Sequence, residues 1–443
     1  MKATRALSLM VLSVLLTVLF GCASSHPHLM ATPVIYKDER LDIFSDVPAD
    51  LRTTTVPVFY ATSRKPLAPG KDSLYSAMRS DEGIQLGLAQ VGLGEPGWTF
   101  DDLVASDRTS SVDKPRPGRV ERIEAIGNVY AGEARTDAER QFVRRINEYL
   151  AKVRSPEIVL YVHGYRVSFE EVSVLMGSLS TYLGKGATVA FQWPTGGHFW
   201  NYGACTDAEE FIPDIERLIE LLSHTEAEYI NMIGYSCGSP LLASALAHLR
   251  GRFADESREQ LTKRFRIGSV VFAGSDVDLK RFAREHVPGI MDLAQQTNVY
   301  ISLGDRALGF STMVAGTSRI GRPDIKELRV EDLQNLAKDP RLYAIDVTDV
   351  RGDHEMGGMR GHGYWYANEW IASDVLVSLR LPLSPEDRCL IPDKTRQKIW
   401  LFPDNYQDCV ADRIYKTFPV LGAKGLEREA NPAARITRGE KGR

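Results

Sequence analysis

One serine in the chain has neighbours that suit a nucleophile. Ser236 stands at the centre of the pentapeptide GYSCG, residues 234–238. The mostly apolar residues before it predict a strand, and residues 239–247 predict a helix with Pro240 in its first turn. A glycine on each side leaves room for a sharp turn that lifts the hydroxyl out of the backbone. The pattern therefore predicts acyl-transfer chemistry at Ser236, and the alternative is a plain buried turn.

A serine hydroxyl needs a base to accept its proton, and histidine is the usual one. His362 lies between Gly361 and Gly363, in a loop after the last predicted strand. We expect His362 to be the base, with His354 in the same region as the second candidate. For either residue the alternative is an ordinary histidine of a surface loop.

The base in turn needs a carboxylate that orients its ring and stabilises its charged form. Asp305 follows the strand predicted at 298–303, and we expect it to be this acid. Asp276 and Asp278, after the strand predicted at 267–273, are the alternatives. An aspartate in the position of Asp305 can also serve simply as a helix N-cap.

The negative oxygen that forms during acyl transfer needs two hydrogen-bond donors held in place. The backbone N–H of Cys237, directly after the nucleophile, is one expected donor. The other is expected in the loop after the strand at 158–162, at the N–H of Tyr165. His163 precedes Ser236 in the chain and is expected to be a buried scaffold residue.

Strands and helices alternate through the middle of the chain, and a capping box at 136–139 predicts the start of one helix. The predicted strands are 56–62, 87–93, 158–162, 187–193, 229–233, 267–273, 298–303 and 342–347. This order predicts a mostly parallel sheet with helices on both faces. Ligands of such sheets bind at the carboxyl ends of the strands, where the polar residues above are found. Residues 95–134 are polar, and no element is predicted there.

Seven short stretches, in order, resemble a bacterial family of uncharacterised α/β-hydrolases described as esterase- or lipase-like. They are residues 58–64, 162–165, 191–194, 234–238, 276–278, 305–308 and 362–365. Tyr235 and Cys237 stand where that family usually has His and Met. The resemblance spans about 56–377 and implies a mechanism class, without a substrate. Together with the residues above, we expect an α/β-hydrolase fold over 56–385 and a serine hydrolase that cleaves carboxylic esters, small or lipid-like, without a cofactor.

The N-terminus has the pattern of an export signal. Residues 1–21 combine two positive charges with a short apolar stretch, which is typical of a signal peptide. Leu19-Phe20-Gly21-Cys22 resembles the lipobox of bacterial lipoproteins. This resemblance implies a lipid on Cys22 and a place on the outer membrane, facing the periplasm. Residues 22–55 are then expected to be a lipidated tether; the alternative is a secreted protein cleaved near Ala23.

The remaining features limit the partners. A net charge of −4 argues against nucleic acid, and no Cys or His pair has the spacing of a metal site. Residues 386–443 are expected to form a C-terminal extension with a disordered basic tail, and a disulfide between Cys389 and Cys409 is left open. A non-catalytic envelope lipoprotein that uses a hydrolase-like domain for binding is the alternative function. The oligomeric state is not predicted.

Overall fold

The computed structural model describes residues 27–71, 73–110, 114–130, 136–195, 207–351, 361–396 and 398–417. Within these residues, eleven strands form one sheet in the order β12-β13-β11-β10-β9-β8-β6-β7-β1-β4-β5. The sheet strands are β1 (Thr55–Thr62), β4 (Ile84–Leu93), β5 (Gly118–Val129), β6 (Glu157–Val162), β7 (Ala187–Gln192), β8 (Tyr229–Tyr235), β9 (Ile267–Ala273), β10 (Gln296–Ile301), β11 (Leu342–Asp346), β12 (Ile391–Pro392) and β13 (Ile399–Leu401). A separate small sheet pairs β2 (Arg64–Pro66) with β3 (Tyr75–Arg79).

The centre of the large sheet is parallel, as the alternation of strands and helices predicts. From β1 through β7, β6, β8, β9, β10 and β11 to β13, every neighbouring pair runs in the same direction. Antiparallel strands β4 and β5 extend one edge, and β12 closes the other. The carboxyl ends of β6, β8, β9, β10 and β11 therefore meet along one rim of the sheet.

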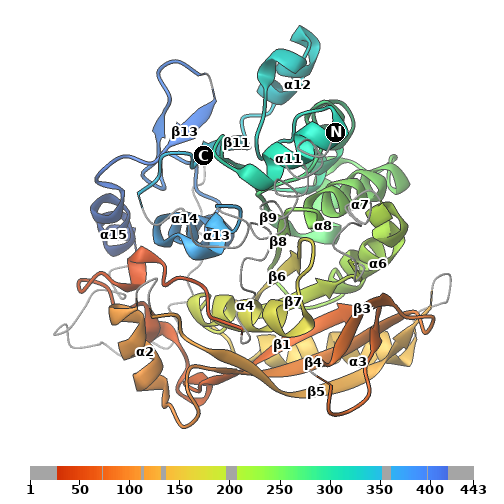
Figure 1. Ribbon diagram of the computed structural model, residues 1–443, viewed down its shortest axis with the longest axis vertical. Helices are drawn as coiled ribbons and strands as arrows, with labels where there is room; N and C mark the ends of the chain where they lie inside the picture. The colour runs from red at the N-terminus through yellow and green to blue at the C-terminus, as the bar shows by residue number, and fades with distance from the viewer. Residues whose placement is uncertain are drawn as a thin grey trace, which may run out of the picture.

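Helices cover both faces of the sheet because its central strands are apolar on both sides. Along β6, Ile158 and Leu160 face one core, whereas Val159 and Tyr161 face the other. The helices are α2 (Phe100–Thr109), α3 (Asp137–Leu150), α4 (Phe169–Tyr182), α6 (Ile212–Leu222), α7 (Gly238–Arg252), α8 (Arg258–Phe265), α9 (Leu279–Arg281), α10 (Val287–Leu293), α11 (Arg306–Ala315), α12 (Val330–Lys338), α13 (Tyr364–Ala367), α14 (Glu369–Arg380) and α15 (Tyr406–Thr417). Figure 1 shows α6, α7 and α8 on one side and α14 and α15 on the other. No helix in the described part of the chain is both long and apolar enough to cross a membrane.

The segment 27–52 packs against this α/β body, so the prediction of a free tether over 22–55 is wrong for these residues. It contains the short 3-10 turns η1 (Val34–Tyr36), η2 (Ile43–Asp46) and η3 (Ala49–Leu51). Its buried apolar side chains are Met30, Val34, Ile35, Tyr36, Leu41, Ile43, Phe44 and Val47. Their burial provides the hydrophobic free energy that holds the segment in place.

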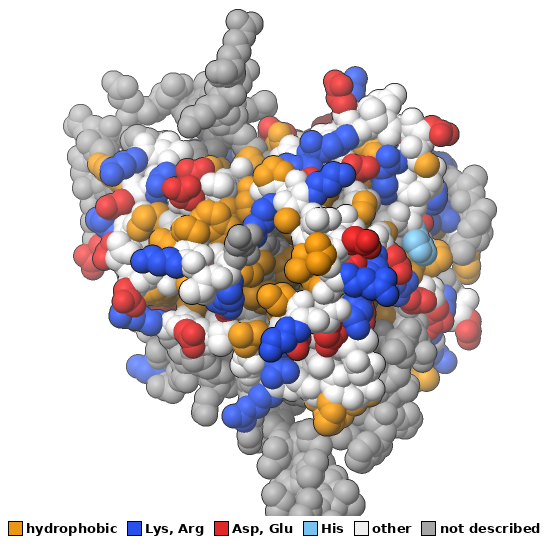
Figure 2. Space-filling view, turned by 90° about the horizontal axis from the view of Figure 1, so that it is seen from above, with side chains coloured by type: hydrophobic (Ala, Val, Ile, Leu, Met, Phe, Trp, Pro, Cys, Tyr) orange, Lys and Arg blue, Asp and Glu red, His pale blue; other side chains and the backbone are white. Residues whose placement is uncertain are grey.

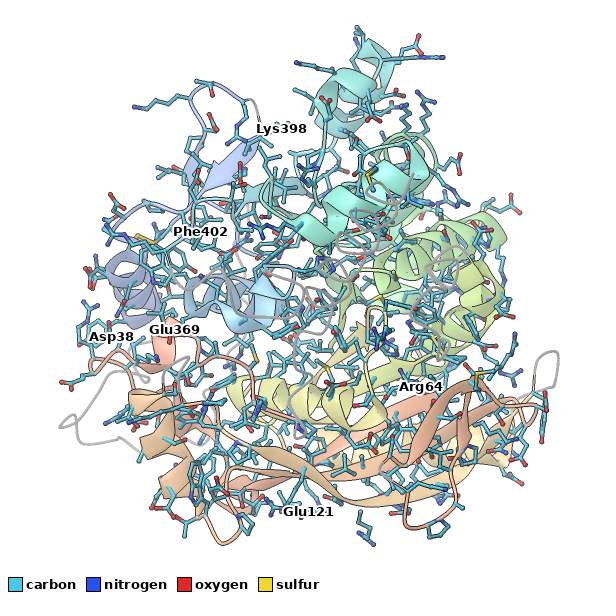
Figure 3. All side chains as sticks on the ribbon, viewed as in Figure 1. Asp38, Arg64, Glu121, Glu369, Lys398 and Phe402 are labelled. Carbon is cyan, nitrogen blue, oxygen red and sulfur yellow. A yellow bond between two sulfur atoms is a disulfide. The ribbon has the colours of Figure 1, made fainter. Side chains whose placement is uncertain are left out.

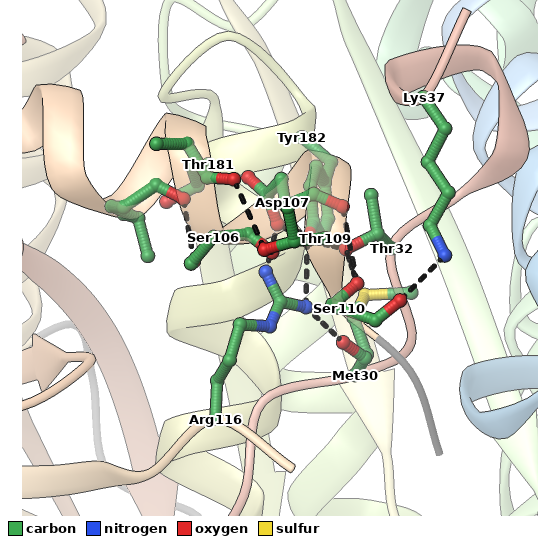
Figure 4. Close-up of polar contacts among 12 residues, drawn as sticks. Met30, Thr32, Lys37, Ser106, Asp107, Thr109, Ser110, Arg116, Thr181 and Tyr182 are labelled. Atoms are coloured by element: carbon green, nitrogen blue, oxygen red, sulfur yellow. Dashed lines mark hydrogen bonds and ion pairs between the residues drawn. The ribbon is translucent and has the colours of Figure 1, made fainter. Parts of the chain in front are cut away.

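Polar contacts fix the same segment (Figure 4). Asp107 of α2 forms a buried ion pair with Arg116, and Tyr182 of α4 donates to Asp107 at 2.6 Å. Thr32 donates to the same carboxylate at 3.0 Å, and Arg116 donates to the carbonyl of Met30 at 2.7 Å. On the same side of the molecule, Figure 3 shows Asp38 beside Glu369 of α14, and Lys37 pairs with Glu369. Buried charges require such pairing, so this network specifies where the segment lies.

Residues 388–417 continue the sheet instead of forming a separate unit. Strand β13 pairs with β11, and a disulfide joins Cys389 to Cys409. Arg388 is fully buried and pairs with Asp374 of α14 at 2.8 Å. The expected basic tail lies outside the described residues.

The region 95–134 holds two elements that its composition does not indicate. Helix α2 begins with a capping box between Thr99 and Asp102. Strand β5 pairs with β4 from Gly118 to Val129, although most of its residues are only half-buried. An edge strand with one solvent face needs no continuous apolar run, which explains why β5 escapes a search for such runs.

Candidate active site

Ser236 occupies a sharp turn between β8 and α7. Its backbone φ is +52°, a left-handed conformation that a residue with a side chain rarely adopts. The turn fits because its glycines allow close packing: a Cβ at Gly238 would lie 2.3 Å from the carbonyl oxygen of Val162. At Gly234 a Cβ would lie 3.0 Å from the Cα of Ser239. The two flanking glycines of the motif are therefore needed for space.

His362 and Asp305 lie beside this serine. The Oγ of Ser236 is 2.8 Å from the Nε2 of His362, and the Nδ1 of His362 is 2.7 Å from Asp305 Oδ2. All three side chains are buried: Ser236 is 9% exposed, His362 5% and Asp305 1%. Hydrogen bonds between buried groups are stronger than those in water, so the imidazole is held firmly between hydroxyl and carboxylate.

Asp305 also caps α11, which fixes its carboxylate. Its Oδ1 accepts from the backbone N–H of Leu308 at 3.0 Å, while Oδ2 faces His362. Asp305 therefore serves as a helix N-cap, the alternative role expected from the sequence, and it also contacts His362. The helix positions the carboxylate at the carboxyl end of β10.

The two alternative acids make other contacts. Asp276 accepts from Ser311 and pairs with Arg319, at 3.2 Å between Arg319 Nε and Asp276 Oδ1. Asp278 caps α9 by accepting from the N–H of Arg281 at 2.8 Å. His354, the alternative base, lies outside the described residues.

The loop that carries His362 is shaped by two neighbours that sequence reasoning did not single out. Gly274, at the end of β9, has φ of +52°, and a Cβ there would lie 3.0 Å from His362 Cε1. The hydroxyl of Tyr364 accepts from the N–H of Gly274 at 2.6 Å and donates to the carbonyl of Tyr300 at 2.9 Å. The loop is therefore fastened to β9 and β10, the strands between the nucleophile and the acid. The sequence signal that could have indicated this contact is Gly274, a glycine directly after a predicted strand.

A second loop, the one after β6, also lies close to Ser236. A Cβ at Gly164 would lie 2.7 Å from the Cβ of Ser236. The next residue is Tyr165, and Arg166 then takes a φ of +57°. Both expected donors, the N–H groups of Tyr165 and Cys237, belong to segments adjacent to Ser236. Cys237 is in a disulfide, so its sulfur, 3.8 Å from Asp276 Oδ2, donates no hydrogen bond.

His163 is wholly buried, as expected of a scaffold residue. Its ring stacks on Trp193 with 5.7 Å between centroids, and the indole N–H of Trp193 donates to the His163 carbonyl at 2.9 Å. Burial, together with the nearby charge of Arg64, holds the pKa of His163 well below its usual range. The ring of His163 is therefore neutral at physiological pH. Its neighbour Arg64 was not expected from the sequence to have a role at the site.

Some apolar side chains are exposed just before Asp305 and on α11, the helix that it caps. Leu303 precedes Asp305 and is 46% exposed, and Met313 on α11 is 71% exposed. Helices α11 and α12 lie at the top of Figure 1. Figure 2 looks down on this end and shows hydrophobic side chains around a hollow, with Lys and Arg side chains among them. No cluster of three or more metal-binding side chains is found among the residues that the structure describes.

A comparison with protein-family models agrees with this architecture. The family model "Alpha/beta hydrolase of unknown function (DUF900)" matches residues 138–379, which include all three residues of the hydrogen-bonded set. A solved structure, a lipase-esterase related protein from Clostridium acetobutylicum, is 16% identical with a TM-score of 0.23, covering 60% of this chain and 95% of that one. No curated protein matches. The chain has an α/β-hydrolase fold and belongs to this family of α/β hydrolases of unknown function.

Proposed function

We propose that the protein is a serine hydrolase that cleaves carboxylic esters through an acyl-enzyme at Ser236. One observation carries the proposal: the strained Ser236 has its Oγ 2.8 Å from His362 Nε2, and the opposite nitrogen of that ring is 2.7 Å from Asp305. A nucleophile, a base and a carboxylate that orients the base are the three groups that this chemistry needs.

In the acylation step, Ser236 Oγ attacks the ester carbonyl while His362 Nε2 takes its proton. Asp305 accepts the Nδ1–H of His362 at 2.7 Å, which fixes the tautomer and stabilises the imidazolium. The tetrahedral oxyanion binds to the N–H groups of Cys237 and Tyr165. When the ester C–O bond breaks, His362 returns the proton to the departing alcohol, and the acyl group remains on Ser236.

In the deacylation step, a water molecule takes the place of the alcohol. His362 removes one proton from this water as its oxygen bonds to the acyl carbon. The bond between Ser236 and the acyl carbon then breaks, and the proton passes from His362 to the serine oxygen. The products are a carboxylic acid and the original enzyme, so no cofactor or oxidant is required.

The surroundings of Asp305 favour esters with an apolar part. Leu303 is exposed two residues before Asp305, and Met313 is exposed on α11, the helix that Asp305 caps, so both offer apolar surface to a ligand. A small or lipid-like acyl group would bury part of that surface.

Chromogenic esters test the proposal. p-Nitrophenyl esters with acyl chains of 2 to about 12 carbons are supplied to residues 27–443 and to its Ser236→Ala variant. Turnover by the wild-type protein that Ser236→Ala abolishes is the expected result. Ser239→Ala, a buried serine three residues further on, is the control and retains turnover. Equal activity of wild type and Ser236→Ala would refute the assignment, and no turnover of any ester would favour a binding role.

For location, we propose that Cys22 carries a lipid and holds the protein on the periplasmic side of the outer membrane. Since the backbone of Pro27 already bonds to Gly118 of β5, at most residues 23–26 separate Cys22 from the folded body. Four residues span at most about 14 Å, so the body would lie close to the membrane surface. Mass spectrometry of the mature N-terminus tests this: a diacylated or triacylated Cys22 is expected, and an unmodified N-terminus near Ala23 would contradict it.

A further inference from the structure

Arg64 is a buried cation at the edge of the candidate site. It follows β1, is 2% exposed and is labelled in Figure 3. Its Nε donates to the carbonyl of Trp193 at 3.0 Å, and its Nη2 donates to His163 Nε2 at 2.9 Å and to the carbonyl of Val167 at 2.8 Å. One guanidinium thus connects the ends of β1, β6 and β7 with the start of α4.

This burial is unusual because Arg64 has no carboxylate in salt-bridge contact among the described residues. A buried charge that lacks an opposite charge is unfavourable, and burial lowers the pKa of Arg64 to about 10. The nearby charges of Glu170 and Glu171 offset only part of this effect. An apolar residue would fill the position at lower cost, so the three hydrogen bonds of the guanidinium need an explanation beyond packing.

The contact with Arg64 fixes the tautomer of His163. Because His163 Nε2 accepts from Arg64, its proton is on Nδ1, which donates to the carbonyl of Gly164 at 2.7 Å. The side chain of His163 therefore holds the backbone of the following residue. The orientation of the Gly164 carbonyl determines the plane of the peptide bond that contains the N–H of Tyr165.

Arg64 also holds both ends of the loop that contains Tyr165. His163 and Val167, its two contacts through Nη2, are two residues before and two residues after Tyr165. Between them, Gly164 packs on Ser236 so closely that a Cβ would lie 2.7 Å from the serine Cβ. The loop is therefore fixed relative to the nucleophile from two sides.

We propose that Arg64 and His163 are positioning residues that hold the N–H of Tyr165 in the oxyanion site of Ser236. The inference rests on the proposed function, since it concerns the transition state of that reaction. Neither side chain touches the reacting atoms. Their effect is to keep a backbone donor in the geometry that the oxyanion requires, before the oxyanion forms.

Four variants test the inference: Arg64→Met, Arg64→Lys, His163→Phe and, as a matched control, Arg388→Met. Arg388 is also a buried arginine with three hydrogen-bonded partners, but these belong to α14, β10 and the loop after α14. Each protein is first titrated to completion with a fluorophosphonate to count functional serines. Then kcat and KM are measured with p-nitrophenyl butyrate, and inhibition is measured with butylboronic acid, which binds serine as a tetrahedral adduct.

The expected result for Arg64→Met is one labelled serine per protein and a fall in kcat of roughly 10- to 100-fold per labelled site. KM should change by less than about threefold. The inhibition constant of butylboronic acid should rise by about the same factor by which kcat falls. His163→Phe, which retains the stacking on Trp193, should show a smaller loss. Arg64→Lys should remain impaired, because one ammonium group cannot reach all three acceptors. Arg388→Met should be less stable but normal per labelled site.

Two results would overturn the inference. The first is wild-type kcat per labelled site in Arg64→Met, because a loss of total activity that the count of labelled serines explains entirely would show a structural role only. The second is full activity in Arg64→Lys. Failure of the wild-type protein to react with the fluorophosphonate or any ester would refute the proposed function itself, and this inference with it.

Discussion

Replacing Gly164 with alanine changes the space beside the nucleophile without altering any of the three hydrogen-bonded residues. The new Cβ would lie 2.7 Å from the Cβ of Ser236 and 3.2 Å from Tyr235 Cδ1. Carbon atoms in ordinary contact are at least ~3.5 Å apart, so the loop and the serine must separate by roughly 0.8 Å. The backbone of Gly164 lies outside the left-handed region, so crowding alone causes the effect.

A displacement of this size is small for the fold but large for the reaction. Overpacking of this kind costs about 1–3 kcal/mol of stability. A misplacement near 1 Å reduces catalysis by about 100-fold. We therefore expect Gly164→Ala to be folded, with kcat for p-nitrophenyl butyrate reduced on the order of 100-fold.

The assay compares kcat per folded molecule with the free energy of unfolding in urea. Gly251→Ala is the matched control, because a Cβ at Gly251 on α7 meets no atom within 4 Å. In a helix this control should be neutral or slightly stabilising, with unchanged kcat. Wild-type kcat and stability in Gly164→Ala would refute the account of the close approach, and equal losses in both variants would show that the effect is not local.

Three other perturbations have defined outcomes. Asp305→Asn should lower kcat by roughly 10³- to 10⁴-fold, because the amide favours the wrong tautomer of His362; a change below tenfold in ester turnover would contradict the role of Asp305. Burial lowers the pKa of Lys185 from 10.5 to about 7 in the folded protein. Between these two pH values the unfolded chain holds more protons than the folded protein, so the free energy of unfolding rises with pH. Lys185→Met should remove this rise, which urea unfolding at pH 7 and 9.5 measures, and an unchanged slope would be evidence against it. Replacing both Cys389 and Cys409 with serine should lower the free energy of unfolding by about 3 kcal/mol, since they close a loop of 20 residues; equal urea midpoints would contradict this.

The parallel core of the fold could be predicted because its signals are local. Continuous apolar runs such as residues 158–162 indicate strands buried on both faces, and the capping box at Thr136 indicates where α3 begins. The proximity of Ser236, Asp305 and His362 follows from the same logic, since residues that end neighbouring parallel strands meet at one rim. Their hydrogen bonds agree with that placement.

The parts that could not be predicted depend on contacts between distant residues. Strand β5 is half-polar and forms through its pairing with β4. The segment 27–52 has no regular apolar period, and its place depends on Asp107 and Arg116, more than 50 residues away along the chain. Arg64 contacts His163 at a separation of 99 residues, so nothing in its neighbourhood identifies its role.

Mass spectrometry of the protein after reaction with a fluorophosphonate tests the central claim most directly. The account predicts one adduct per molecule, mapped to the peptide that contains Ser236, and slow labelling in His362→Gln because the base is absent. An unlabelled wild-type protein, or an adduct on any other residue, would contradict it.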